Sequence, residues 1–192
     1  NLMTELKINK TDFKGYIDTT SKSKVIALIE KDLSKNINSA QKDEEVYLIL
    51  DETPFYPEGG GQIGDRGNLF NDACKYSILD TQIQDDIIYH VVEGEGRLKV
   101  KDKVNIQVSK ERYSTTRHHS VTHLLHAALK KVLGNHVGQQ GSLVAPDKLR
   151  FDYNCEKAPS ITQKNEIEQL VNDQIRSAKP VLIEMMSQDD AK

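Results

Sequence analysis

The amino-acid sequence predicts an α+β fold in two parts: a small β-barrel-like domain over residues 1–108 and an incomplete α/β part over residues 109–192. Three observations predict it. Short runs of β-forming residues separated by turn residues fill the first part. The pattern of a long amphipathic helix starts the second part. A hairpin pattern, a second helix and a last strand follow that helix.

Strand-forming runs dominate the first part. The clearest candidates are residues 46–50, 76–79, 87–92 and 100–108, the last of which alternates apolar and polar side chains. Turn residues separate the runs at Asn68, at Asn71 with Asp72, and at 93–96, where two glycines alternate with two glutamates. Short strands at this spacing are typical of a small barrel or sandwich.

Residues 116–133 have the repeat of an amphipathic helix, with Ser114, Thr115 or Thr116 as its cap and Gly134 at its end. The apolar positions are Val121, Leu124, Leu125, Ala128, Leu129, Val132 and Leu133. Residues 141–144 and 149–153 then flank a turn at 145–148 and predict a hairpin.

A second helix is predicted by apolar residues on one face, namely Ile167, Leu170, Val171 and Ile175. Pro180 begins a last strand that runs to residue 183. Residues 187–190 look like an N-cap followed by acidic first-turn residues. We therefore expect another helix to begin there, and the sequence to stop inside a larger domain.

Composition and charge limit the classes of protein to which the chain can belong. No apolar run approaches the roughly 20 residues that cross a bilayer, and no signal-peptide pattern is present, so we expect a cytoplasmic protein with no membrane partner. Cys74 and Cys155 are too few and too far apart for a disulfide framework. The net charge is −3, yet residues 97–150 hold 11 Lys and Arg against 3 Asp and Glu. This basic stretch is either a phosphate-facing surface or a solvated basic face.

His119 and His123 are the first candidates for chemistry. They are four residues apart, so a helix places them one turn apart on one face, where two imidazoles can bind one metal ion. With His126 they centre opposite the apolar stripe, which predicts that the three face solvent or a cleft rather than the core. A surface histidine cluster stays an alternative, because a zinc site needs three or four protein ligands.

Two further segments are candidates. Residues 58–67 hold five glycines in ten positions and lack the lysine of a phosphate-binding loop, which leaves a turn or a loop that a partner approaches closely. Gln139 and Gln140 precede the hairpin, where their amides can point into a cleft. Ser120 and Thr122 lie beside the histidines, but one helix does not establish a nucleophile.

Together these segments resemble the alanyl-tRNA synthetases. Residues 51–67 resemble the glycine-rich signature of that family, residues 119–129 its HxxxH helix, and residues 138–152 the segment that follows the helix. The flanks at 13–16 and 186–192 also fit, so the similarity spans nearly the whole chain in the order of the family.

The resemblance implies an α/β editing core, an aminoacyl-tRNA hydrolase that cleaves the ester of serine or glycine on tRNA specific for alanine. In the family the HxxxH pair, here His119 and His123, binds zinc together with a downstream Cys-x-x-x-His. The sequence ends before such a pair, so we expect this segment to bind zinc weakly or not at all and its own activity to be impaired. The rest of the parent synthetase chain, including the aminoacylation domain, would be its partner.

The resemblance also implies roles for single residues. Gln139 matches a glutamine implicated in editing, and Thr122 matches a residue beside the scissile aminoacyl group. The acceptor end of tRNA is the expected ligand of the glycine-rich loop and the basic stretch. The residues concerned are Gly60, Gly61, Gln62, Lys130, Lys131, Lys148 and Arg150.

Two other functions stay open. One is a freestanding trans-editing deacylase of the same superfamily, which a parent gene without an ATP-binding domain would favour. The other is a tRNA-binding or assembly module without chemistry, which failure of the intact parent to release serine from Ser-tRNA would favour.

Overall fold

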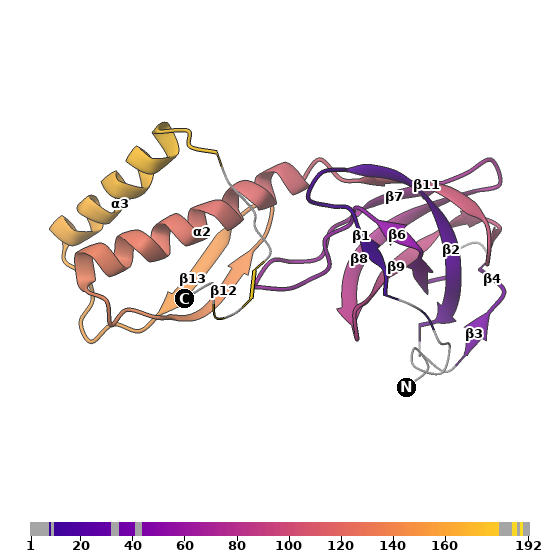
Figure 1. Cartoon of the computed structure of the whole chain (residues 1–192), viewed down its shortest axis with the longest axis horizontal. Coiled ribbons are helices and arrows are strands. Elements are labelled where there is room, and N and C mark those ends of the chain that lie inside the picture. The colour runs from indigo at the N-terminus through magenta and orange to yellow at the C-terminus, as the bar shows by residue number, and fades with distance from the viewer. Residues whose placement is uncertain are drawn as a thin grey trace. The chain divides into compact units, whose positions relative to one another are not determined.

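A computed structural model describes residues 8, 10–31, 35–40, 44–180, 186, 187 and 189 (Figure 1). The chain forms two compact units, one of residues 1–119 with 141–150 and one of residues 120–140 with 151–192. The division into domains at 108/109 stays a prediction. The long helix and the hairpin each contribute residues to both units.

The first unit contains a closed barrel of six strands. Its order is β11 (Lys103–Val108), β7 (Gly67–Phe70), β8 (Cys74–Gln84), β9 (Ile87–Gly96), β5 (Val46–Leu50) and β2 (Thr20–Glu30). Antiparallel pairing of β11 with β2 closes the ring, which removes the free strand edges of an open sheet. The predicted β-barrel-like fold of the N-terminal part is therefore confirmed.

Short strands complete the barrel unit. β3 (Asn36–Ile37) pairs antiparallel with β2, and β4 (Ser39–Ala40) pairs with β10 (Leu98–Lys99). β1 (Asp12–Phe13) pairs in parallel with β6 (Glu52–Thr53). The barrel strands alternate buried and exposed residues, as strands with one apolar face do. Their inward side chains form most of the main core, with Leu28, Leu48, Leu69 and Tyr76 among its largest members, and Phe55 from the segment after β6 joins them.

The glycines at 93–96 are not a turn, as the sequence analysis expected, because β9 continues through Gly96. Gly94 lies opposite Tyr76 on β8, and a Cβ there would come within 2.3 Å of the Lys75 carbonyl oxygen. The Tyr76 hydroxyl donates to the Gly96 carbonyl, and burial raises the pKa of Tyr76 to about 12. These glycines therefore make room for the neighbouring strand and its buried tyrosine.

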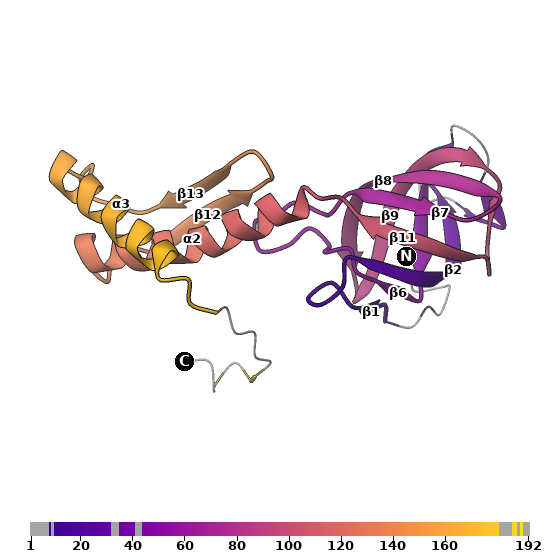
Figure 2. The same ribbon diagram turned by 90° about the horizontal axis from the view of Figure 1, so that it is seen from above.

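The second unit is built on α2 (Arg112–Leu133). Both views show α2 between α3 (Ile161–Arg176) and the hairpin of β12 (Gln139–Val144) and β13 (Leu149–Tyr153) (Figures 1 and 2). Apolar residues of α2 and α3 share one core, which includes Leu129 and Ile167. At the start of α3 the Ser160 and Gln163 side chains bond each other's backbone N–H groups, a capping box. The predicted helix, hairpin and helix are confirmed.

The start of α2 differs from expectation. α2 begins at Arg112, before the predicted caps at 114–116, because Arg112 is held by partners distant in sequence. Gly134 ends the helix as predicted, with a φ of 114°. The expected strand at 180–183 and helix start at 187–190 fall largely outside the described residues.

His90 is a buried histidine in the barrel. Its side chain is fully buried, and burial lowers its pKa to about 3. The Thr81 hydroxyl donates to the Asp65 carbonyl oxygen at 2.8 Å and lies 3.2 Å from His90 Nδ1. Since that hydroxyl has given its proton away, Nδ1 donates to it, and His90 is held as the neutral imidazole.

We predict that His90 makes the stability of the barrel depend on pH. Its pKa is about 6.5 in the unfolded chain and lower in the fold, so protons bind the unfolded state preferentially between the two values. The contribution is complete above pH 6.5 and lost at about 1.4 kcal/mol per pH unit as the pH falls toward 3.

Urea unfolding of the chain and of His90→Gln between pH 7 and 4 measures this effect as the difference between their pH slopes. His136→Gln, at an exposed position, is the matched control and should keep the wild-type slope. Parallel slopes for the chain and His90→Gln would contradict the assignment.

Candidate functional site

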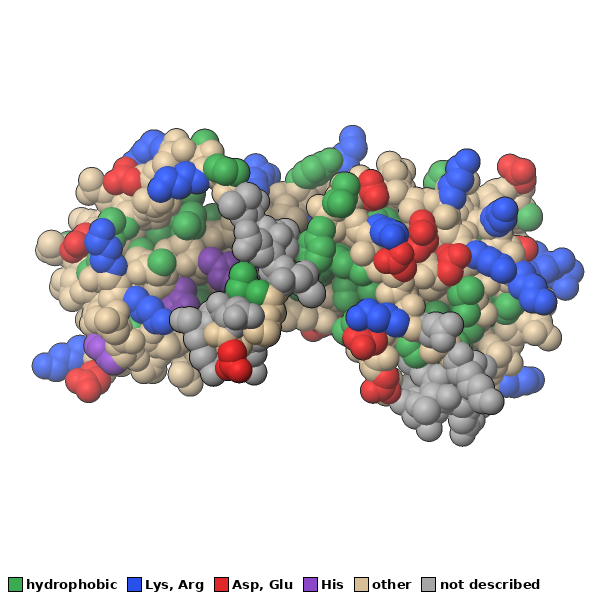
Figure 3. Space-filling model, in the orientation of Figure 1, with side chains coloured by type: hydrophobic (Ala, Val, Ile, Leu, Met, Phe, Trp, Pro, Cys, Tyr) green, Lys and Arg blue, Asp and Glu red, His purple; other side chains and the backbone are tan. Residues whose placement is uncertain are grey.

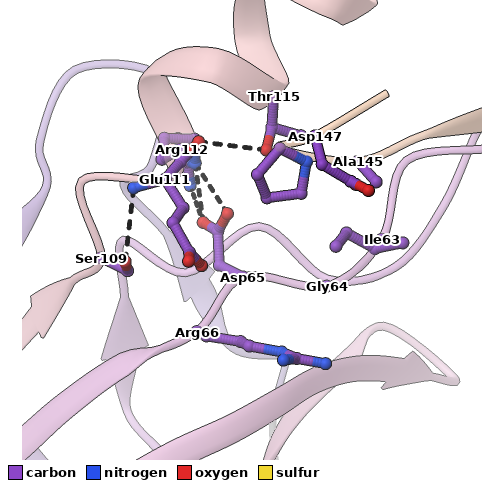
Figure 4. Close-up of a pocket in the computed structure, with 11 residues that line it drawn as sticks. Ile63, Gly64, Asp65, Arg66, Ser109, Glu111, Arg112, Thr115, Ala145 and Asp147 are labelled. Carbon is purple, nitrogen blue, oxygen red and sulfur yellow. Dashed lines mark hydrogen bonds and ion pairs between the residues drawn. The ribbon is translucent and has the colours of Figure 1, made fainter. Parts of the chain in front are cut away.

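The start of α2 is joined to the glycine-rich loop by a buried ion pair within the first unit. Arg112 Nε donates to both Asp65 carboxylate oxygens, at 2.9 and 2.7 Å, and Nη2 also contacts Oδ2. The two side chains are only 10% and 5% exposed. Figure 4 shows them pointing toward each other from the helix and the loop, while Arg66 points away.

The remaining donors of Arg112 bind backbone. Nη1 donates to the Gly15 carbonyl and Nη2 to the Pro54 carbonyl, each at 2.9 Å. The guanidinium therefore joins three segments distant in sequence to the first turn of α2. A lysine cannot reproduce this pattern, because its ammonium lacks the planar fork of donors.

Asp65 is itself held by the barrel. Its Oδ2 accepts the Tyr56 N–H at 2.8 Å, and its own N–H donates to the Tyr56 carbonyl at 2.9 Å. Its carbonyl accepts the Thr81 hydroxyl. Bonds to Tyr56 and Thr81 therefore hold Asp65 in place in addition to its bonds to Arg112.

The glycine-rich loop also pairs with β12. The Val144 N–H donates to the Gly61 carbonyl at 2.7 Å, and the Ile63 N–H donates to the Val144 carbonyl at 3.1 Å. Gly61 has a φ of +82°, and a Cβ there would lie 2.0 Å from Ser142 Oγ and 2.8 Å from the Ser142 carbonyl oxygen. Both the conformation and the close approach require glycine at this position.

Gln62 links the loop to the first of the two predicted histidine ligands. Its side chain is 3% exposed, and its Oε1 lies 2.7 Å from His119 Nδ1. A carbonyl oxygen only accepts, so Nδ1 is the donor, and in the neutral imidazole the lone pair is then on Nε2. This is the tautomer in which an outer hydrogen bond orients a metal-binding histidine.

A pocket of about 330 Å³ lies beside the ion pair in the first unit (Figure 4). Arg66, Glu111 and Asp147 bring charges of both signs to its wall. His118, on the adjacent turn of α2, places Nδ1 2.7 Å from the Ala145 carbonyl, which ties the helix to the hairpin turn. Mixed charge suits a polar ligand and does not select one chemical class.

Several predicted site residues belong to the second unit. Thr122 is buried on α2, and His123 is exposed one turn after His119. Lys130 and Lys131 are exposed in the last turn of α2, and Gln139 is exposed at the start of β12. Histidine side chains are visible on this part of the surface (Figure 3). Lys148 and Arg150 are exposed around the hairpin turn of the first unit. The roles proposed for all these residues stay predictions.

His126 differs from the sequence analysis, which placed it away from the core with the other two histidines. Its ring packs 5.3 Å from that of Phe151, and its Nε2 is buried with no hydrogen-bond partner among the described residues. The reason is that α2 is covered on two sides, so the face opposite α3 meets the hairpin. The apolar stripe in the sequence predicted the contact of α2 with α3 but not its contact with the hairpin.

The histidine pair is incomplete as a metal site. No group of three or more His, Cys, Asp or Glu residues that could hold a metal occurs in the described part of the chain. Cys74 is buried in the barrel and Cys155 is exposed. His119 and His123 nonetheless fit a zinc ion in donor type and spacing, since both are imidazoles one helical turn apart.

Sequence reasoning missed the Arg112–Asp65 pair and the Gln62–His119 bond. Asp65 was visible as an acid within the glycine-rich motif, which is a weak signal for a buried partner. Arg112 gave no signal, because its partners are 47 to 97 residues away in sequence.

Comparison with known proteins gives consistent results. The family of class II (A) tRNA synthetases matches residues 1–112. Alanine–tRNA ligases of Coxiella burnetii, Alkaliphilus metalliredigens and Haemophilus influenzae are 42%, 44% and 43% identical over 184, 186 and 185 residues. Each alignment covers 95% of this chain and 21% of the relative, so the chain spans about a fifth of their length. No described helix is long and apolar enough to cross a membrane.

We predict that Arg112→Lys lowers the free energy of unfolding of the first unit by about 3 kcal/mol, because the Asp65 charge stays buried with a poorer partner. Arg117→Lys, an exposed change on the same helix, should cost less than about 0.5 kcal/mol. Urea unfolding measures both, and equal losses in the two variants would refute the role of the pair.

We also predict that Gly61→Ala costs about 2–4 kcal/mol, from its positive φ and its clash with Ser142. Gly60 is the matched control, with a φ of +59° and no atom closer than the Tyr56 hydroxyl at 4.0 Å. Gly60→Ala should therefore cost only about 1–2 kcal/mol. The two variants are compared by thermal unfolding, and a larger loss at Gly60 would contradict the close approach.

Proposed function

We propose, from the premise that the chain belongs to the class II (A) tRNA synthetases, that it is the editing segment of an alanyl-tRNA synthetase. In the intact protein it hydrolyses the ester of serine or glycine on tRNA specific for alanine. Water adds to the ester carbonyl, the bond to the ribose oxygen breaks, and the free amino acid and tRNA leave.

The observation that carries this proposal is the hydrogen bond between Gln62 and His119. It joins the glycine-rich motif to the HxxxH helix, two segments 57 residues apart in sequence. A solvated surface histidine needs no buried amide to fix its ring. The bond therefore supports a working role for His119 over the alternative of a surface histidine cluster.

Zinc is the proposed cofactor of the intact domain. His119 and His123 would hold it, with Gln62 orienting the ring of His119. When bound, zinc acts as a Lewis acid that can orient the aminoacyl end or polarise a water. The two other ligands would come from a downstream Cys-x-x-x-His, as the family resemblance implies.

The tRNA acceptor end is the proposed ligand. Lys130, Lys131 and Arg150 are exposed and can bind its phosphates. The Gly60 backbone offers a place for close approach, while Gly61 is proposed to act by holding this loop against Ser142. Gln139 and Thr122 are proposed to contact the aminoacyl group. The parent protein works in the cytoplasm, where translation supplies its substrate.

One observation favours a second function for the chain by itself. The described residues hold only two histidines of a metal set that needs three or four. By itself the chain would then bind tRNA without hydrolysing the ester.

We predict that His119→Ala with His123→Ala removes zinc and Ser-tRNA deacylation together from the intact parent. Zinc per chain should fall to less than about a tenth, because the two remaining ligands do not hold the ion. Gln62→Ala should weaken zinc binding about 10- to 100-fold, as loss of an outer hydrogen bond does.

His136→Ala is the control, since His136 is exposed and lies outside α2. Zinc is measured by mass spectrometry and hydrolysis by release of labelled serine. A wild-type parent that binds zinc but releases no serine would refute the hydrolase and leave the binding module.

A further inference from the structure

The outer face of the barrel presents a regular array of polar side chains. Over residues 22–26 of β2, 75–79 of β8 and all of β7 and β11, every second residue is exposed or half-buried, and strand pairing sets these residues side by side. One row runs through Lys22, Asn105, Phe70 and Lys75, and the next begins with Lys24 and Lys103. We call these six residues the lysine face.

Lys24 and Lys103 are directly opposite each other on neighbouring antiparallel strands. Like charges at such positions destabilise a sheet. None of the four lysines of the face forms an ion pair with any described acid, whereas Lys14 and Lys31 of the same barrel each do. The face therefore keeps positive charges together at a cost to the fold.

Nearby acids offset part of this charge, and one of them, Glu95 on β9, lies directly opposite Lys75. Lys22, Lys24 and Lys103 line a hollow of about 510 Å³ together with Asp51 and Asp72. Asp51 Oδ1 accepts the backbone N–H groups of Lys24 and Glu52, at 2.8 and 2.9 Å, and keeps its negative charge. Three lysines and two aspartates therefore leave the hollow with a net charge of +1. Lys and Arg side chains are visible at the right of Figure 3, with Asp and Glu side chains among them. The hollow suits a ligand that brings phosphates.

Phe70 adds a second feature. Its side chain is 41% exposed, and its neighbours across the two adjacent strands are Asn105 and Lys75. An aromatic ring on a strand, flanked by amides and lysines, is how proteins stack an unpaired base and bind the backbone beside it. A membrane surface would use the charges but not the single ring between Asn105 and Lys75.

We propose that the lysine face binds the ribose–phosphate backbone of an RNA, with one unpaired base stacked on Phe70. The choice of RNA over another polyanion rests on the proposed function, while the face itself rests on strand register and exposure. Phosphates bound between Lys24 and Lys103 reduce the repulsion between these two lysines. Phosphate binding thus explains why both opposite positions hold lysine.

The test is binding of a fluorescent single-stranded RNA and of a tRNA transcript to the whole chain at several salt concentrations. Lys24→Gln with Lys103→Gln should weaken binding and reduce the salt slope by about 1 per lysine. The same variant should be at least as stable as the wild type, because the repulsion is removed. Phe70→Leu should weaken binding about five- to a hundredfold with an unchanged salt slope.

Lys14→Gln with Lys31→Gln is the matched control, since it removes two barrel lysines that are paired with acids. It should leave the salt slope unchanged. Equal effects of the two double variants would overturn the lysine face. So would lysine-dependent binding to vesicles of phosphatidylserine and phosphatidylcholine with no binding of either RNA.

The result is separable from the proposed hydrolase. If the intact parent releases serine and the lysine variants bind RNA normally, only the lysine face fails. If RNA binding depends on the face and the parent releases no serine, only the hydrolase fails.

Discussion

Arg112 and Asp65 bring two charges out of water, and a buried charge is stable only when its partner and its remaining hydrogen bonds are in place. The guanidinium meets that condition with one carboxylate and two backbone carbonyls. The pair therefore forms only when the loop, the strand connections and the first turn of α2 have reached their positions together. Because the same helix carries His119 two turns later, the position of the candidate ligand depends on a contact at the helix start.

From Asp65 the polar network continues into the barrel. The Asp65 carbonyl accepts the Thr81 hydroxyl, and that hydroxyl accepts from His90. Arginine can only donate and the carboxylate can only accept, whereas the Thr81 hydroxyl does both. Such a chain specifies one arrangement of the loop, because reversing any member leaves a buried group unsatisfied. The price is His90 Nε2, which is buried with no hydrogen-bond partner among the described residues.

Local sequence patterns predicted much of the fold. Residues 46–50 were predicted from β-forming side chains and coincide with β5, and Gly134 ends α2 as its freedom at positive φ suggests. Residues 93–96 were predicted to form a turn. Glycines between glutamates suit a loop, but they also suit a strand that lies opposite a buried tyrosine, and the local sequence does not distinguish the two. His126 was misplaced because a helical stripe does not reveal a second covered face. The Gln62–His119 bond was beyond prediction, since it depends on how a loop folds against a helix 57 residues later.

The placement of Gln62 suggests why a barrel accompanies the histidine helix. An amide that orients an imidazole must itself be held in place. A side chain on a free loop would lose conformational entropy each time it became ordered against the imidazole. Here the loop backbone bonds β12 on both sides of Gln62, through Gly61 and Ile63, while Asp65 is held by Tyr56 and Arg112. The entropy of ordering the loop is therefore lost on folding rather than on ligand binding. Gly61 permits this, because a Cβ at that position would clash with Ser142 of β12. The backbone of the motif thus binds the strand, and the Gln62 side chain binds the helix.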